Sequence, residues 1–228
     1  KYSTSHLDYS IRRQLRDFKQ VCRDTARQYC FELRIPECIK VTTVAPTGTI
    51  AKLPGKSEGI HPIYGKYFKR RVRYADSDPK IEELRRQGLH IEPCIYNSNT
   101  LVVTFICKDA LVEEVEALGL NANELVEGAN EVSLADHLAV QAMFQEEYAD
   151  NAVSFTVNVE PGKYTIDQAM GTIIHYLPRI KGTTIMVDAS RAQSPYERLS
   201  KEEFEKLAHL STVAQGEMDC STGACPIR

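Results

Sequence analysis

Residues 41–50 read Val-Thr-Thr-Val-Ala-Pro-Thr-Gly-Thr-Ile, and they indicate more about the fold than any other internal stretch. The short, β-branched run 39–44 predicts a buried strand. This strand would pass directly into a turn in which Gly48 lets the backbone approach a ligand closely. If Thr49 opens a short helix, its free N–H groups favour a phosphate. Because α/β proteins bind ligands beyond the carboxyl ends of their strands, the position favours a ligand site.

Two interpretations of this turn stay open on the residues alone. A Pro-Thr-Gly-Thr sequence is more often a plain turn than a phosphate site, and the Gly-Lys-Ser/Thr ending of a Walker motif is absent. The position after a predicted strand shifts the balance towards phosphate binding.

Helical and strand-like patterns alternate on both sides of this stretch. Further strands are expected at 66–74, 101–107, 152–159 and 182–187. Helices are expected at 7–26, 78–88, 111–118 and 133–148. Two further helices are expected to begin after the capping pairs Thr165 with Gln168 and Ser200 with Glu203. The alternation predicts an α/β architecture with a largely parallel sheet.

Composition narrows the class of protein. The chain has 228 residues, 43% hydrophobic and 26% charged, with a net charge of -3, which gives no sign of a nucleic-acid binder. No apolar run is long enough to span a membrane, and no signal peptide is visible. Seven scattered cysteines indicate a reducing compartment, the cytoplasm, rather than a disulfide scaffold. The chain starts at Lys1 within helical sequence and without Met, so we expect a piece of a longer protein.

The last nine residues, 220–228, carry Cys220 and Cys225 on a small segment with a glycine between them. Terminal segments are poorly ordered unless tied down, so these thiols should be reachable. A mobile dithiol can reduce a buried disulfide and return to be reduced in turn. An incidental pair of cysteines is the alternative. A zinc site is disfavoured because no His or further Cys lies at ligand spacing, and no metal-ligand set is expected elsewhere.

Several short motifs follow one another along the chain. They are 45–50 (Ala-Pro-Thr-Gly-Thr-Ile), 58–62 (Glu-Gly-Ile-His-Pro), 67–73 (Tyr-Phe-Lys-Arg-Arg-Val-Arg), 150–157, 182–188, 193–198 (Gln-Ser-Pro-Tyr-Glu-Arg) and Cys220-x4-Cys225-Pro226-Ile227. Together they resemble the adenosylcobalamin-dependent (class II) ribonucleotide reductases, and in part the single-chain ribonucleoside-triphosphate reductases. The resemblance covers nearly the whole chain, and the order and combination of the motifs make it specific.

The resemblance implies a ten-stranded α/β barrel, of which residues 1–213 would form the second half and 214–228 a flexible tail. The family reduces ribonucleotides to 2′-deoxyribonucleotides, using a thiyl radical that adenosylcobalamin generates on a finger-loop cysteine. Carried over by motif, Cys220 and Cys225 would be the redox shuttle that thioredoxin or a similar dithiol recycles. The substrate would be a ribonucleoside triphosphate, with a diphosphate as the alternative.

The same carry-over assigns ligand contacts. The substrate phosphates would be held by Ala45, Pro46, Thr47, Gly48, Thr49 and Ile50, with the two threonines as hydroxyl donors. Corrin-contacting segments would run approximately from Pro54 to Val115 and from Ile174 to Val213. Within them, His61 reads as a solvated loop residue or a cofactor contact, and the basic run 69–73 as a solvated face or a ligand contact.

One departure from the family limits the function of this chain alone. The Asn-x-Cys-x-Glu pattern of the finger loop is absent, as is the amino-terminal effector region. We therefore expect the amino-terminal part of the reductase as a partner and no activity without it. Cys22, Cys30, Cys38, Cys94 and Cys107 are expected to be buried packing residues. The alternative function is a non-catalytic nucleotide-binding or thiol-exchange module.

Overall fold

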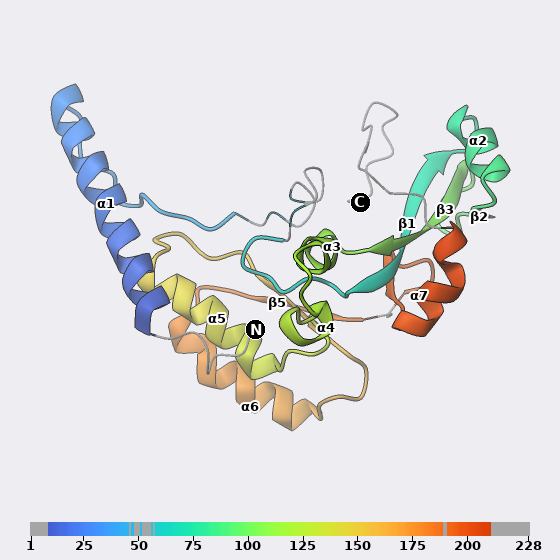
Figure 1. Cartoon of the computed structure of the whole chain (residues 1–228). Coiled ribbons are helices and arrows are strands. Elements are labelled where there is room, and N and C mark those ends of the chain that lie inside the picture. Colours follow the sequence, from blue (N-terminus) through green and yellow to red (C-terminus); the bar gives the residue numbers. More distant parts are fainter. Residues whose placement is uncertain are drawn as a thin grey trace. The chain divides into compact units, whose positions relative to one another are not determined.

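The computed structural model describes residues 9–45, 47, 51, 56, 58–188 and 191–210, except the side chains of residues 9 and 210. It divides into two compact units, and Figure 1 labels most of their helices and strands. The first unit comprises residues 1–48, 58–62 and 129–188, and the second comprises 49–57, 63–128 and 189–228.

The first unit begins with the long helix α1 (Tyr9–Leu33), which confirms the expected helix and extends it. The helix ends in a Schellman turn, in which Arg34 adopts a left-handed φ of 55°. The N–H of Ile35 donates to the carbonyl of Cys30 at 3.0 Å, and that of Arg34 to the carbonyl of Phe31 at 3.1 Å. Pro36 follows, so the chain reverses against the last turns of the helix.

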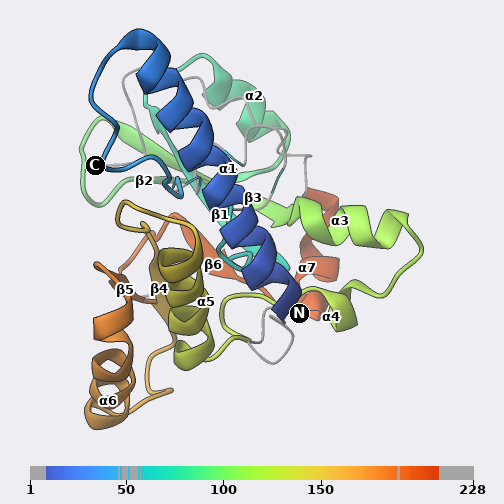
Figure 2. The same ribbon diagram turned by 90° about the vertical axis from the view of Figure 1, so that its left-hand side faces the viewer.

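Helix α5 (Leu134–Glu147) forms the centre of the first unit. Its amino end is capped by Ser133, whose side chain accepts from the N–H of Asp136. It packs against α6 (Ile166–Tyr176), which has the expected capping box, and the 3-10 turn η3 (Leu177–Arg179) follows α6. Figure 2 shows α5 alongside the parallel strands β4 (Thr156–Val159) and β5 (Thr184–Val187).

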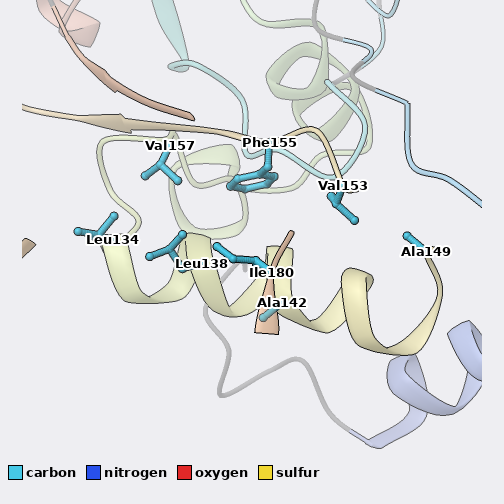
Figure 3. Close-up of a cluster of buried hydrophobic side chains, with 8 residues drawn as sticks. All are labelled: Leu134, Leu138, Ala142, Ala149, Val153, Phe155, Val157 and Ile180. Atoms are coloured by element: carbon cyan, nitrogen blue, oxygen red, sulfur yellow. The ribbon is translucent and has the colours of Figure 1, made fainter. Parts of the chain in front are cut away.

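Apolar side chains from α5 and from the chain around β4 form one cluster (Figure 3). Burying a side chain of the size of Leu or Phe contributes about 1.5–3 kcal/mol. This cluster therefore fixes β4 and the chain before it on α5. Its buried members are Leu134, Leu138, Ala142, Ala149, Val153, Phe155, Val157 and Ile180.

The second unit contains a four-stranded antiparallel sheet in the order β2-β3-β1-β6. Its strands are β1 (Tyr67–Ala75), β2 (His90–Pro93), β3 (Thr100–Lys108) and β6 (Tyr196–Arg198). The long central pair runs in register from Tyr67↔Lys108 to Ala75↔Thr100. The helices of this unit are α2 (Lys80–Arg86), α3 (Ala110–Ala117), α4 (Ala122–Leu125) and α7 (Lys201–Leu207), followed by the 3-10 turn η4 (Ala208–Leu210).

Two expectations about the sheet are wrong. The described residues form a mixed α/β fold in which only β4 and β5 pair in parallel, rather than a largely parallel sheet. Residues 39–44 are not a strand, and Ile39 is 88% exposed. Their β-branched composition suits a strand, but among the described residues no neighbouring strand pairs with them. Closure of a ten-stranded barrel stays a prediction, and the tail boundary expected at 213 lies outside the described residues.

Candidate functional site

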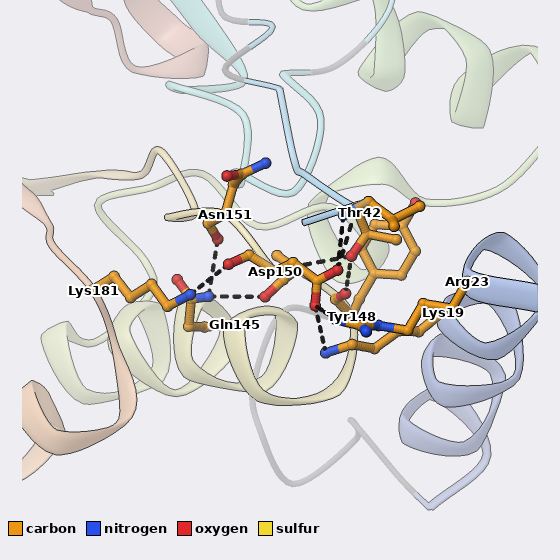
Figure 4. A network of polar contacts seen from close by, with 10 residues as sticks. Lys19, Arg23, Thr42, Gln145, Tyr148, Asp150, Asn151 and Lys181 are labelled. Carbon is orange, nitrogen blue, oxygen red and sulfur yellow. Dashed lines mark hydrogen bonds and ion pairs between the residues drawn. The ribbon is translucent and has the colours of Figure 1, made fainter. Parts of the chain in front are cut away.

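The segment that leads to the expected phosphate loop is held by one carboxylate, Asp150, just after α5 (Figure 4). One oxygen, Oδ2, accepts the backbone N–H groups of Val41 at 3.0 Å and Thr42 at 3.4 Å. The other, Oδ1, accepts from the guanidinium of Arg23 at 2.6 Å and lies 3.5 Å from Nζ of Lys19. Although burial raises the pKa of Asp150, these donors together hold it well below its usual range.

Thr42 completes this attachment. Its hydroxyl donates to the carbonyl of Tyr148 and accepts the N–H of Asp150 at 3.1 Å. Its own carbonyl accepts the N–H groups of Asp150 and Asn151 at 3.0 and 3.1 Å. The backbone groups that a strand would direct to a neighbour are therefore satisfied by the turn after α5.

The loop 58–62 lies beside this segment, and a glycine makes the approach possible. Gly59 has a φ of 59°, a conformation that side chains rarely adopt. A Cβ added at Gly59 would lie 2.8 Å from Oγ1 of Thr47 and 3.8 Å from the carbonyl oxygen of Ala45. Any other residue would therefore push this loop away from Thr47.

His61 anchors the same loop to β4. The backbone N–H of Thr156 donates to Nε2 at 3.0 Å, so Nδ1 carries the proton and donates to the carbonyl of Glu58 at 3.1 Å. The ring stacks on Phe155 with a centroid distance of 4.4 Å. Burial lowers the pKa of His61, which favours the neutral ring that these contacts require. The contacts favour an anchoring role over contact with a cofactor.

Thr47 carries the most informative atom of the site. Its Oγ1 is buried, and among the described residues it has no hydrogen-bond partner. Leaving a buried hydroxyl unsatisfied costs about 1–3 kcal/mol. A ligand oxygen placed beside this atom would accept a hydrogen bond from it.

The structure describes only some of the expected site residues. Ala45 is exposed and Thr47 is half-buried, and both lie beside Gly59. The sequence places Gly59 in the motif 58–62 but does not indicate that it neighbours the loop 45–50. This glycine was the only available signal, and it does not indicate which segment the loop contacts. Pro46, Gly48, Thr49 and Ile50 lie outside the described residues, as do Cys220 and Cys225.

In the second unit, β6 joins the two segments expected to contact the corrin ring. It pairs with β1 from Phe68↔Arg198 to Arg70↔Tyr196. Part of the basic run on β1 is neutralised there, because Glu197 binds Nζ of Lys69 at 2.7 Å and also pairs with Arg71. Burial raises the pKa of Glu197. Lys69 and Arg71 lower it by more than burial raises it, so the net shift of the pKa is downward.

Next to this pair, Arg198 is fixed against Tyr64. Its Nε donates to the carbonyl of Tyr64 at 2.8 Å, and the guanidinium lies 4.2 Å from the centre of the Tyr64 ring. Gly65 gives it room, since a Cβ there would lie 3.2 Å from Cγ of Arg198.

The expectation for the cysteines is partly wrong. Cys30, Cys94 and Cys107 are buried, but Cys22 is half-buried and Cys38 is exposed. Pro36 and the turn after α1 carry Cys38 out of the helix, so the residue type alone did not indicate its exposure.

None of the described helices is both long and apolar enough to cross a membrane.

The fold and motifs agree with the comparisons to known proteins. Residues 39–186 match the barrel domain of ribonucleotide reductases, so the chain belongs to the ribonucleotide reductase family. A crystal structure titled as a B-12 dependent (class II) ribonucleotide reductase is 33% identical to this chain and superposes on it with a TM-score of 0.69. The match covers 89% of this chain and 27% of that one. The resemblance to the class II enzymes is thereby confirmed.

Two curated relatives carry more specific names. A Mycobacterium phage D29 protein, provisionally named an adenosylcobalamin-dependent ribonucleoside-triphosphate reductase, is 43% identical over 236 residues, which cover 100% of this chain and 34% of that protein. The adenosylcobalamin-dependent ribonucleoside-triphosphate reductase of Levilactobacillus brevis is 32% identical over 223 residues, which cover 89% of this chain and 28% of the enzyme. The chain thus spans about a third or less of the length of these relatives.

Proposed function

We propose that this chain is the carboxyl-terminal part of an adenosylcobalamin-dependent ribonucleoside-triphosphate reductase, and that residues 45–50 hold the substrate phosphates. The observation that carries the phosphate assignment is the buried hydroxyl of Thr47, which lacks a partner among the described residues. Asp150 holds the segment at Val41 and Thr42, and Gly59 allows the loop 58–62 to lie directly against Thr47. A segment that is already held at one end loses less entropy when a ligand binds.

In this proposal the chain supplies substrate binding and the final electron transfer. The tail thiols of Cys220 and Cys225 reduce the active-site disulfide left by each turnover, and thioredoxin or a similar dithiol reduces the tail in turn. The radical-bearing cysteine belongs to the amino-terminal part of the reductase. A triphosphate is favoured over a diphosphate because the named relatives are triphosphate reductases.

The residues that would hold the cofactor are those of the segments 54–115 and 174–213. The support is structural, because β6 from the second segment pairs with β1 from the first and fixes Arg198 over Tyr64. Aromatic faces and fixed cationic donors suit a large ring bearing amide groups. Adenosylcobalamin, when bound, supplies the radical that starts reduction.

The phosphate assignment predicts the effect of Thr47→Val in the complete reductase. A hydrogen bond to a charged group contributes about 1.5–3 kcal/mol, so loss of the hydroxyl should raise the substrate KM about tenfold or more. Because the hydroxyl has no partner among the described residues, the same change should leave the free energy of unfolding of the unliganded protein unchanged or slightly higher. Steady-state kinetics and urea unfolding measure the two effects.

Thr43→Val is the matched control, since Thr43 is exposed in the same segment and should keep a wild-type KM. Gly48→Val and Thr49→Val test the rest of the loop, and Gly48→Val should be the most damaging because a β-branched side chain would block a close approach. A wild-type KM in Thr47→Val, together with lost stability, would mean that the hydroxyl serves the fold and not the substrate.

The cofactor assignment predicts a footprint in hydrogen exchange. Adenosylcobalamin added to the complete reductase should slow amide exchange in β1 and β6, where the two segments meet. Helix α1 lies outside both segments and serves as the internal control. Equal exchange of β1 and β6 with and without cofactor would remove the segment assignment.

A further inference from the structure

Two thiols meet at the carboxyl end of α1. The proposed function gives neither of them a role. Sγ of Cys30 and Sγ of Cys38 lie 3.9 Å apart, within hydrogen-bonding distance for sulfur. Cys30 is buried on the helix, and Cys38 is exposed in the chain that follows.

The backbone itself brings the two thiols together. The Schellman turn at Arg34 reverses the chain, and the N–H of Ile35 is bonded to the carbonyl of Cys30 itself. Arg27 on the helix binds Glu37 at 3.3 Å, directly before Cys38. Both contacts hold the start of the returning segment close to the helix, directly before Cys38.

A disulfide requires a sulfur–sulfur distance of about 2.05 Å, so the two atoms must approach by about 2 Å. The exposed side chain of Cys38 is free to supply that movement by rotating about χ1. Among the described residues, no group of three His, Cys, Asp or Glu side chains is placed to hold a metal ion. Redox chemistry therefore suits this dithiol better than metal binding.

We propose that Cys30 and Cys38 are an oxidative modification site, a dithiol that closes to an intramolecular disulfide when it meets an oxidised low-molecular-weight disulfide. The exposed Cys38 thiolate attacks one sulfur of the oxidant, which breaks the oxidant's S–S bond and releases one thiol. Cys30 then attacks Sγ of Cys38 in the mixed disulfide and releases the second thiol. Two electrons pass from the protein thiols to the oxidant, and the two protons leave with the released thiols.

The pKa of Cys38 is raised, mainly by the hydrogen bond with Cys30 and by charge repulsion from that thiol. Burial and Glu37 make smaller contributions in the same direction. The thiolate is the attacking species, so the raised pKa slows the reaction and a higher pH speeds it. Closure would tie the end of α1 to the segment that continues to Thr42. This inference does not depend on the proposed function.

Peptide mapping tests the proposal directly. The full-length chain, and in parallel the reductase that contains it, is incubated with glutathione disulfide at mildly alkaline pH, quenched in acid and alkylated. Trypsin cuts after Arg27, Arg34 and Lys40, so Cys30 and Cys38 fall in separate peptides, 28–34 and 35–40. We expect these two peptides to be recovered joined by a disulfide and to separate on reduction.

Controls distinguish structure from mere closeness in sequence. Cys22→Ser should keep the 30–38 bridge, because Cys22 lies in peptide 20–23 and outside the pair. In Cys38→Ser, Cys30 should stay free, and in Cys30→Ser, Cys38 should retain bound glutathione. In strong urea the preference for 30–38 over bridges to Cys22 should disappear. Separate glutathione adducts on both cysteines of the native wild type, or an equal preference in urea, would overturn the proposal.

Discussion

In the complete reductase, Cys220→Ser and Cys225→Ser should each abolish sustained turnover with thioredoxin while leaving one burst of deoxynucleotide per active site. The first reduction draws on active-site thiols that are already reduced, so the burst does not need the tail. Every later cycle needs a thiol exchange that a single cysteine cannot complete. Quenched-flow product measurement gives the burst, and steady-state assay gives the turnover.

A small dithiol such as dithiothreitol should restore much of the activity, because it diffuses to the disulfide without the tail. Cys22→Ser is the matched control and should turn over normally. Folding should be unchanged in both tail variants, since a terminal segment contributes little packing. Normal thioredoxin-dependent turnover in both variants would mean that the two cysteines are incidental.

Asp150→Ala should cost the first unit much more stability than the loss of an exposed ion pair does. It removes the acceptor of Arg23 and of the two N–H groups that fix residues 41 and 42. Leaving these partly buried donors without their acceptor costs about 1–3 kcal/mol. The matched control is Asp17→Ala, because Asp17 pairs with Arg13 at 3.8 Å on the exposed face of α1 and should contribute at most about 1 kcal/mol. Urea unfolding measures both, and equal losses would contradict the role of Asp150.

The same carboxylate predicts an acid dependence. The pKa of Asp150 is lower in the folded protein than in the unfolded chain, as is that of Glu147, where Arg16 is the main cause. Their contribution to stability is therefore fully present above the unfolded value, about 4, and is lost as the pH falls through the folded values. The wild type should lose stability below about pH 4, and Asp150→Asn should show a flatter curve over the same range. Parallel curves would contradict this prediction.

Local signals in the sequence predicted the helices well. Ser133, Thr165 with Gln168, and Ser200 with Glu203 all cap helices as expected, because a cap depends on residues three positions apart. Strand β3 was also expected, since its apolar run is long and continuous.

Features that depend on distant partners could not be predicted. Residues 39–44 have the composition of a strand, but their hydrogen bonds go to Asp150, more than a hundred positions away in the sequence. Strand β6 has only three residues and exists through its pairing with β1. The sequence supplied the family motif around Gly59 but not its contact with Thr47, because no local pattern encodes which loops touch.

The composition of the antiparallel sheet also affects how the protein behaves at high concentration. Exposed sheet edges can pair with other chains and begin aggregation. Here one outer strand, β6, is three residues long and carries Glu197 and Arg198, and the other, β2, has four residues and ends at Pro93, which has no N–H to donate. The nine-residue strands β1 and β3 lie between them. The strands of this sheet that are long enough to pair stably with another molecule therefore do not lie at its edges. We expect this arrangement to limit intermolecular β-pairing, and hence aggregation, during synthesis and storage.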